Sequence, residues 1–200
     1  PLFDNFTEII VIAGYKINKI ENHFIGNKKV KIIRNKDYMS TNMVYSFSLV
    51  KKYIKDDFIV SYGDIIFDKN IILQIIKKNL TIMPINKNWM EYWSLRMNYK
   101  DLVKDAENLI IKENNLVEIG TKIDKILPKF QFMGIMKFKK KDFFSFINYF
   151  KKINNAKIDF TSFTNLCLKK KIIKINVSKT NLYWFEIDNE KDLKVASKIL

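Results

Sequence analysis

Short apolar runs alternate with helical patterns between Thr7 and Ile85, and this alternation limits the fold more than any other feature of the sequence. Each run has the length of a strand and ends near turn-forming or polar residues. The predicted strands are Thr7–Ala13, Val30–Arg34, Asp57–Tyr62 and Leu80–Ile85, and the helices between them are Lys16–Phe24, Asn42–Tyr53 and Asn70–Lys78. Ser40, Thr41 or Asn42 supplies the N-cap of the second helix. Such alternation predicts an α/β fold with a mostly parallel, mixed sheet covered by helices on both faces.

The pattern changes after Pro84. The segment from Trp89 to Arg96 is a loop or short helix, and a hairpin follows that turns at Glu113–Asn115. The remaining predictions are hairpin strands within Asp105–Lys112 and Leu116–Ile119, a strand at Gln131–Phe138, helices Lys141–Lys152 and Phe160–Lys170, strands Ile172–Asn176 and Tyr183–Ile187, and a last helix from Asn189 or Glu190. Because the sequence contains no repeat, linker or low-complexity block, we expect one domain over residues 1–200.

Composition excludes several classes of protein. Hydrophobic residues make up 48% of the 200 positions, which is enough for a sizeable core. No apolar run approaches the roughly 18 residues of a membrane span, and no signal-peptide pattern is present, so we expect a cytoplasmic protein without membrane contact. The single cysteine, Cys167, excludes an intramolecular disulfide and a cysteine zinc cluster. His23 is the only histidine and has no partner pattern, which argues against Ser-His or Cys-His catalysis.

The formal net charge of +15 suggests a nucleic-acid partner at first sight. The lysines, however, are dispersed through the predicted helices and form only short runs. Lys, Ile and Asn share A/T-rich codons, so coding bias alone could raise all three. We therefore expect small anionic substrates and no nucleic acid. The alternative, a nucleic-acid-binding protein, requires lysines clustered on one face and strongly salt-dependent binding.

Two carboxylates follow predicted strands. Asp64 comes after Asp57–Tyr62, and Asp188 comes after Tyr183–Ile187, with Glu186 on the same side of that strand. The simplest interpretation of each is a turn or helix cap. Together they predict a two-carboxylate Mg²⁺ site at one edge of the sheet, of the kind that serves phosphoryl or nucleotidyl transfer.

Aromatic residues gather between the two carboxylates in the sequence. Trp89, Tyr92 and Trp93 could form a cage for a cationic head group. Arg96, with Lys122 further along, could clamp a phosphate. The alternative is that the tryptophans pack against the sheet, which we expect for one of the two.

These segments, in this order, resemble the phosphocholine cytidylyltransferase-like branch of the sugar-phosphate nucleotidyltransferase superfamily. The resemblance covers essentially the whole chain and rests on several short pieces in register rather than on one specific motif. The pieces are Gly14-Tyr15, Asn35–Tyr38 with Thr41-Asn42 and Ser46, Ser61–Asp64, Asn88–Trp93 with Arg96, Asp105–Glu107, Glu118–Gly120, Gln131–Gly134, and Trp184–Asp188 with Asp192-Leu193.

The resemblance implies a Rossmann-like three-layer nucleotidyltransferase fold, a nucleoside triphosphate and Mg²⁺. The substrate phosphate would attack the α-phosphate, and pyrophosphate would leave. Carried over by position, Asp64 and Asp188 resemble the catalytic metal ligands. The residues that resemble the nucleotide-binding segment are Tyr15, Thr41 and Asn42, and those that resemble the acceptor side are Trp89, Trp93, Arg96, Glu107, Lys122 and Gln131.

Relatives of this kind activate phosphocholine, 2-aminoethylphosphonate or phosphoglutamine. The resemblance therefore predicts transfer of CMP from CTP to such a metabolite, for decoration of a cell-surface polysaccharide or lipid. Gln131 stands where several relatives carry an acidic residue, which leaves the acceptor open. One alternative is a sugar-1-phosphate nucleotidyltransferase that uses UTP or dTTP, and another is a non-catalytic nucleotide-binding module. A homodimer is compatible with each of these interpretations.

The front of the family pattern does not occur in this sequence. Relatives open with a strand, a Gly-rich loop ending in Arg and a Pro-Lys pair, which hold the triphosphate. The sequence begins at Pro1, after those pieces. We therefore expect a fold that lacks its first βα unit, and a chain that is a fragment of a longer enzyme.

Overall fold

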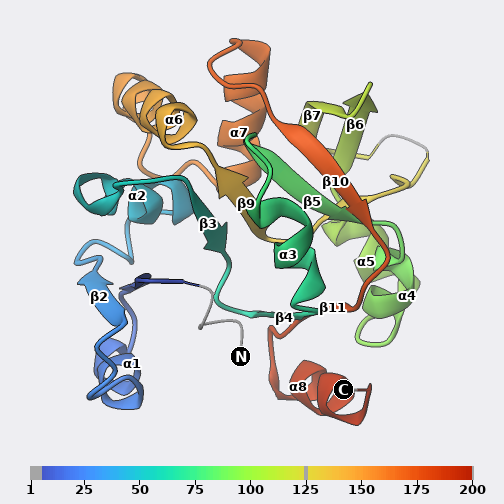
Figure 1. Ribbon diagram of the computed structural model, residues 1–200. Helices are drawn as coiled ribbons and strands as arrows, with labels where there is room; N and C mark the ends of the chain where they lie inside the picture. Colours follow the sequence, from blue (N-terminus) through green and yellow to red (C-terminus); the bar gives the residue numbers. More distant parts are fainter. Residues whose placement is uncertain (1–5, 124–125, 200) are drawn as a thin grey trace.

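Figure 1 shows the computed structural model, which describes residues 6–123 and 126–199. The strands are β1 (Ile9–Ala13), β2 (Val30–Arg34), β3 (Phe58–Ser61), β4 (Ile65–Phe67), β5 (Ile82–Asn86), β6 (Asn108–Lys112), β7 (Asn115–Thr121), β8 (Gln131–Phe132), β9 (Ile135–Phe138), β10 (Asn176–Thr180) and β11 (Trp184–Glu186). The helices are α1 (Ile17–His23), α2 (Met43–Ser48), α3 (Asn70–Ile76), α4 (Trp89–Ser94), α5 (Tyr99–Asp105), α6 (Lys140–Ile153), α7 (Phe160–Lys169) and α8 (Glu190–Ile199), with a short 3₁₀ helix η2 (Lys51–Tyr53). The expected α/β class is confirmed.

The largest sheet has the strand order β3-β9-β5-β10-β7-β6, and β8 pairs with β5 beside this path. β10 runs parallel to β5, whereas every other pair of this sheet that the described residues form is antiparallel. The expected mixed sheet is therefore confirmed, but the prediction that most of its pairs are parallel is wrong. The physical reason is that β6 and β7 form a hairpin and β9 enters through a loop, and neither connection needs a helical crossover.

Two smaller sheets complete the fold. β1 and β2 pair in parallel, with Ile9 opposite Val30, on the left of Figure 1. β4 and β11 pair antiparallel, with Trp184 opposite Phe67, below the large sheet and next to α8. The β4–β11 pair joins segments far apart in the sequence, and it positions the candidate site described below.

Two hydrophobic cores lie on opposite faces of the large sheet. One packs α2, α6 and α7 against the sheet, and its aromatic side chains include Phe47, Phe146 and Phe163. The other packs α3, α4, α5 and β11 on the opposite face. Successive residues of β5 point to different cores, Ile82 to the second and Met83 to the first, as the strand period requires. The three-layer arrangement is thus observed.

Local sequence explains how the helices beside the site begin. The Asn42 side chain caps α2 by accepting the N–H of Met43 at 2.7 Å, in agreement with the predicted cap. Asp159 caps the start of α7, and its carboxylate accepts the N–H of Ser162 at 2.7 Å. Both caps fix the ends of these helices that face the candidate site.

Several predicted elements differ from the observed ones. The strand predicted at Ile172–Asn176 begins instead at Asn176, although Ile173 and Ile175 are buried. Apolar residues indicate burial, and in this segment burial occurs in irregular backbone before the strand. Gly134, with φ of 71°, divides the strand predicted at Gln131–Phe138 into β8 and β9. α5 and β4 are absent from the predictions because their short patterns have no clear period.

Within the part of the chain that the structure describes, no helix combines the length and the apolar character that crossing a bilayer requires.

Candidate active site

A cavity of about 230 Å³ opens where β8, β11 and the first turns of α2 and α7 meet. We call it the acid-lined cavity, because carboxylate side chains form much of its wall. The lining residues are Met43, Tyr62, Trp93, Asp105, Glu107, Gln131, Phe132, Gly134, Asp159, Thr161 and Glu186. In a chain with a net charge of +15, this concentration of acidic groups is unexpected.

The carboxylates of the cavity differ in how they are held. The hydroxyl of Thr161 donates to Glu107 at 2.8 Å. Burial raises the pKa of Glu107, and this hydrogen bond opposes the rise. Burial also acts to raise the pKa of Asp159, but hydrogen bonds from Ser162 and Thr161 outweigh it and lower that pKa below its ordinary value. Asp159 is therefore ionised at neutral pH.

Glu186 carries the largest carboxylate shift. Burial raises its pKa to about 8, even though the neighbouring Arg96 acts in the opposite direction. The charges of Asp188, Asp105 and Asp64 add to the rise. The pKa of Tyr62 is also raised well above its ordinary value. Burial is the main cause, and the charges of Glu107 and other nearby carboxylates add to it. Neighbouring carboxylates thus add to the effect of burial on both pKa values, and a cationic group in the cavity would oppose the rise.

Asp64 and Asp188 lie at the same end of the β4–β11 pair. The backbone N–H of Ile187 donates to the carbonyl of Asp64 at 2.7 Å, which continues the ladder beyond Glu186 and Ile65. Both residues are exposed. The sequence prediction required the two carboxylates to share one edge, and the structure brings their backbones together there.

Two carboxylates are a partial ligand set. Among residues 6–123 and 126–199, no group of three or more His, Cys, Asp or Glu side chains is arranged to hold a metal ion. Mg²⁺ commonly takes one or two carboxylates and fills its other positions with water and substrate phosphates. Asp64 and Asp188 fit that pattern, and the metal itself stays a proposal.

Arg96 is engaged with carboxylates, contrary to the prediction that it clamps a substrate phosphate. Its side chain is 6% exposed and forms ion pairs of 2.5 Å with both Glu186 and Asp188. Lys122, its predicted partner, is exposed just after β7 and does not line the acid-lined cavity. The sequence could not show this, because Arg96 lies 90 positions before Glu186 and 92 before Asp188, and it meets them only through β11.

The predicted aromatic cage is only partly present. Trp89 is buried in the core, where its indole N–H donates to the carbonyl of Pro128 at 3.0 Å, so it cannot contact a ligand. Trp93 packs edge-on against Trp89 and also lines the acid-lined cavity. Tyr92 packs on Phe185 instead of facing the cavity. One tryptophan is therefore structural, as expected, and the other forms a wall of the site.

The predicted nucleotide-side residues lie near one another but have different surroundings. Tyr15 is 66% exposed and has its ring centroid 6.4 Å from that of Tyr38. The Thr41 hydroxyl accepts from Asn35 and donates to the carbonyl of Asp37, so it supports the loop before α2. Asn42 caps α2 and donates to the carbonyl of Lys157. Of these residues, Tyr15 alone presents a largely exposed side chain.

Gln131 lines the acid-lined cavity and fixes the backbone of Glu107. With its amide nitrogen facing the carbonyl of Glu107 and its oxygen facing the N–H of the same residue, it forms hydrogen bonds of 3.0 and 2.8 Å. The sequence predictions omit Met43, Tyr62, Asp105, Asp159 and Thr161 as site residues. Asp159 is recognisable from sequence as a helix cap, but its place in a cavity depends on the tertiary fold.

Comparison with known proteins confirms the resemblance seen in the sequence. No family model matches the chain. A CTP:phosphoglutamine cytidylyltransferase of Campylobacter jejuni is 28% identical in an alignment that covers 94% of this chain and 80% of the relative. A bifunctional protein GlmU of Methanococcus aeolicus is also 28% identical over 94% of this chain, which spans only 42% of that protein.

Solved structures show the same fold. The inositol-1-phosphate CTP transferase of T. maritima superposes with a TM-score of 0.73 at 19% identity, covering 96% of this chain and 77% of that one. The CTP:phosphocholine cytidylyltransferase of Streptococcus pneumoniae gives 0.67 at 17% identity, covering 100% and 85%. The chain therefore has the nucleotidyltransferase fold and is similar to cytidylyltransferases within the sugar-phosphate nucleotidyltransferase superfamily.

Proposed function

We propose that this chain, similar in sequence and fold to sugar-phosphate nucleotidyltransferases, transfers CMP from CTP to a small amine-bearing phosphate or phosphonate and releases pyrophosphate. One observation carries the proposal: the acid-lined cavity lies beside the Asp64 and Asp188 pair, through Glu186 on the same strand. The first site suits the cationic end of an acceptor, and the second suits the phosphates that react.

The reaction is an in-line substitution at phosphorus. An oxygen of the acceptor's phosphate attacks the α-phosphorus of CTP, the bond to the bridging oxygen breaks, and pyrophosphate leaves with the electron pair. Mg²⁺, when bound, neutralises charge on the phosphates, and Asp64 and Asp188 would hold it. The protein's remaining contribution is to position the acceptor so that its phosphate points at CTP.

The charges of the cavity define the acceptor. Asp105, Glu107 and Asp159 line the cavity with Glu186, and no cationic residue lines it, among the residues that the structure describes. An ammonium or trimethylammonium group satisfies such carboxylates, and the Trp93 side chain forms part of the same wall. A hexose lacks the positive charge. Phosphocholine, 2-aminoethylphosphonate and phosphoglutamine all carry it.

The predicted nucleotide-side residues keep a role in this proposal. Tyr15 presents an exposed ring for the base or ribose, and Thr41 and Asn42 fix the start of α2, whose next residue, Met43, lines the cavity. We place the reaction in the cytoplasm, where CTP is available, and the product would serve decoration of a cell-surface polysaccharide or lipid. A homodimer is compatible with this function.

Pyrophosphate release tests the proposal. The full-length gene product is assayed with Mg²⁺ and CTP, UTP or dTTP against phosphocholine, 2-aminoethylphosphonate, phosphoglutamine and a set of hexose 1-phosphates. We expect turnover with CTP and an amine-bearing acceptor. Turnover confined to hexose phosphates would exclude the cationic acceptor, and activity with UTP or dTTP but not CTP would exclude the cytidylyl assignment.

A second function has specific support. The GlmU relatives, and a solved structure named as a putative glucose-1-phosphate thymidylyltransferase of Bacillus anthracis with a TM-score of 0.72, favour a sugar-1-phosphate nucleotidyltransferase. The same panel separates the two functions. Absence of turnover with every pair would favour a non-catalytic nucleotide-binding module.

A further inference from the structure

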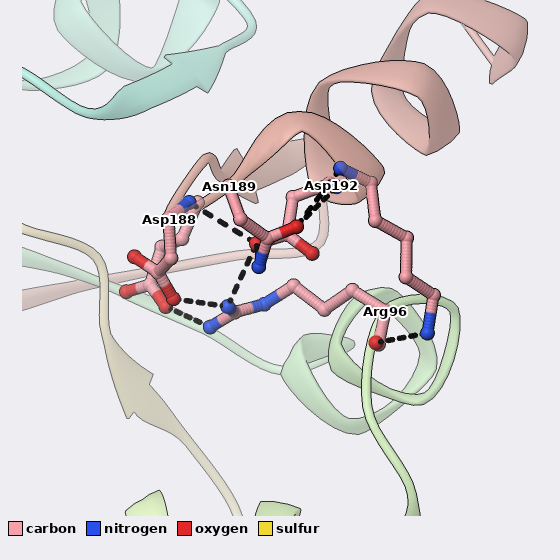
Figure 2. Close-up of polar contacts among 6 residues, drawn as sticks. Arg96, Asp188, Asn189 and Asp192 are labelled. Atoms are coloured by element: carbon pink, nitrogen blue, oxygen red, sulfur yellow. Dashed lines mark hydrogen bonds and ion pairs between the residues drawn. The ribbon is translucent and has the colours of Figure 1, made fainter.

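Arg96 stands between the two parts of the candidate site. It follows α4, is 8% exposed as a residue, and lies with its guanidinium 5.4 Å from the ring centroid of Trp93. Figure 2 shows its side chain reaching toward Asp188 and Asp192 at the start of α8. A buried guanidinium needs anionic partners, so the identity of these partners defines what it does.

The terminal nitrogens of Arg96 make their short contacts with two different carboxylates, and Nη1 also lies 3.5 Å from Oδ2 of Asp192. Nη2 lies 2.5 Å from Oε2 of Glu186, and Nη1 lies 2.5 Å from Oδ2 of Asp188. Glu186 lines the acid-lined cavity, whereas Asp188 is the proposed metal ligand. One planar group therefore spans the acceptor side and the metal side of the site. The planar fork of an arginine pairs with both carboxylates at once in a fixed geometry, with one terminal nitrogen for each.

The backbone of Asp188 is fixed independently. Its N–H donates to Oδ2 of Asp192 at 3.1 Å, and the same oxygen accepts from the side chain of Asn189 at 3.0 Å (Figure 2). These contacts set the position of the residue but leave the orientation of its carboxylate free. Among the hydrogen bonds of the described residues, the one from Arg96 is the contact that holds this carboxylate. It engages Oδ2 and leaves Oδ1 available.

We propose that Arg96 is a positioning residue that orients Asp188 toward the metal, and that it links this ligand to the acceptor cavity through Glu186. The inference rests on the proposed function, because it needs Asp188 to bind a divalent cation. Partners that hold a metal ligand in place typically change metal affinity by about 10- to 100-fold when they are altered. A lysine keeps the charge but presents one compact ammonium, so it cannot hold both carboxylates in the same geometry.

The test is the affinity for Mn²⁺, measured by electron paramagnetic resonance on the full-length protein with a non-hydrolysable CTP analogue. The variant is Arg96→Lys. A matched control is Lys137→Met, which removes another buried cation whose ammonium donates to the carbonyls of Ile76 and Lys78, outside the candidate site. Thermal unfolding of both variants records any general loss of stability.

We expect Arg96→Lys to weaken Mn²⁺ binding at least tenfold and Lys137→Met to leave it within twofold. Arg96→Ala provides a second variant, in which added guanidinium ion should restore Mn²⁺ affinity by occupying the vacated space. Unchanged affinity in folded Arg96→Lys, or no rescue of the alanine variant, overturns the inference. The proposed function fails separately, if the wild-type protein binds Mn²⁺ but does not release pyrophosphate. A wild-type protein without Mn²⁺ affinity overturns the role of Arg96 whatever its activity.

Discussion

Two hollows in the molecule are lined by side chains of opposite charge. They differ in how much hydration their charged groups lose. The acid-lined cavity holds carboxylates that are partly removed from water, and the pKa shifts of Glu107 and Glu186 record that loss. The second hollow, of about 540 Å³, lies where the end of α2 and η2 meet α6. We call it the lysine groove, after its lining residues Ser48, Leu49, Lys51, Lys52, Ile54, Lys140, Phe144 and Lys151.

The lysine groove is the larger hollow, but its charge says less about a ligand than the charge of the acid-lined cavity does. Lysines keep their ammonium groups in water while their stems cover apolar surface, so grouping them costs little. The Lys51 ammonium already has a partner, the side chain of Asn148 at 2.7 Å. Grouped, partly buried carboxylates repel one another and lose hydration. A cationic ligand would relieve that repulsion, and the proposed acceptor site therefore rests on the acidic cavity and not on the net charge of +15.

The largest expected effect concerns the carboxylates beside the acid-lined cavity. Asp64→Asn should lower kcat by about 10³-fold, because metal-assisted charge stabilisation contributes several kcal/mol to phosphoryl transfer. The control is Asp68→Asn, in which the altered carboxylate accepts the N–H of Asn70 near the same pair of strands. Pyrophosphate release at saturating CTP and acceptor gives the comparison. Equal kcat values for the two variants would remove Asp64 from the proposed metal site.

The acceptor should depend on the cavity carboxylates. Glu107→Gln keeps the shape of the side chain but removes its charge, and a hydrogen bond to a charged group is worth about 1.5–3 kcal/mol. We expect the KM of the amine-bearing acceptor to rise by about 10- to 100-fold, with the KM of CTP unchanged. The matched control is Glu118→Gln on β7, where the carboxylate accepts from Asn108 and Thr121 away from the cavity. A parallel rise in both KM values would place Glu107 outside the acceptor site.

Glu107 also predicts a dependence on pH. Burial raises its pKa, so as the pH rises the unfolded chain releases this proton before the folded one does. Its contribution to the free energy of unfolding is therefore fully present below the ordinary pKa and is lost as the pH rises toward the raised pKa. Over the same window the KM of phosphocholine, whose ammonium does not titrate, should fall as the carboxylate ionises.

Urea unfolding and initial rates across that pH range measure both trends. Glu107→Gln should flatten both, so that the variant gains stability relative to the wild type as the pH rises. If the two proteins kept parallel pH profiles, this carboxyl would not be the group that titrates.

The two tryptophans give a smaller and more selective comparison. Trp93→Phe and Trp89→Phe should each lower the free energy of unfolding by about 1–3 kcal/mol, because both indoles are buried in the same core. Only Trp93→Phe should also raise the KM of the acceptor, since Trp89 does not line the cavity. Steady-state kinetics at a temperature well below unfolding separates the two effects. A similar KM change in both variants would mean that Trp93 affects acceptor binding through the packing of the core and not by direct contact.

The sequence predicted the arrangement of elements better than the contacts between side chains. Short apolar runs located β1, β2 and β5, and a helical apolar period located α6. The sequence also predicts that Asp64 and Asp188 are neighbours, but their backbones meet at the antiparallel β4–β11 pair, where Asp64 precedes β4 and Asp188 follows β11. It could not predict that Arg96 would meet Glu186 and Asp188, because that meeting depends on the pairing of β4 with β11.

The acid-lined cavity was hidden for the same reason. Asp105, Asp159 and Glu186 lie on separate segments, and each resembles an ordinary cap or surface residue in its own local sequence. Composition does not reveal the cavity either, since a net charge of +15 describes the whole chain and not a locally acidic site. Clusters built from distant residues need tertiary coordinates, whereas strand ends can be located from local pattern.

The smallest effect is expected at the lysine groove. Replacing Lys51, Lys52, Lys140 and Lys151 together with Gln removes its positive charge without touching the acid-lined cavity. Because Lys52, Lys140 and Lys151 are exposed and all four lysines lie outside the acid-lined cavity, the KM values of CTP and acceptor should stay within twofold. Wild-type binding to an oligonucleotide should stay in the non-specific range of about 10⁻⁴–10⁻⁶ M, and weaken with salt in the wild type and the variant alike. Gel-shift titrations at several salt concentrations measure this. Tight, saturable binding that the quadruple variant abolishes would reverse the comparison, because the groove would then be the ligand site and its lysines would no longer be a solvated surface.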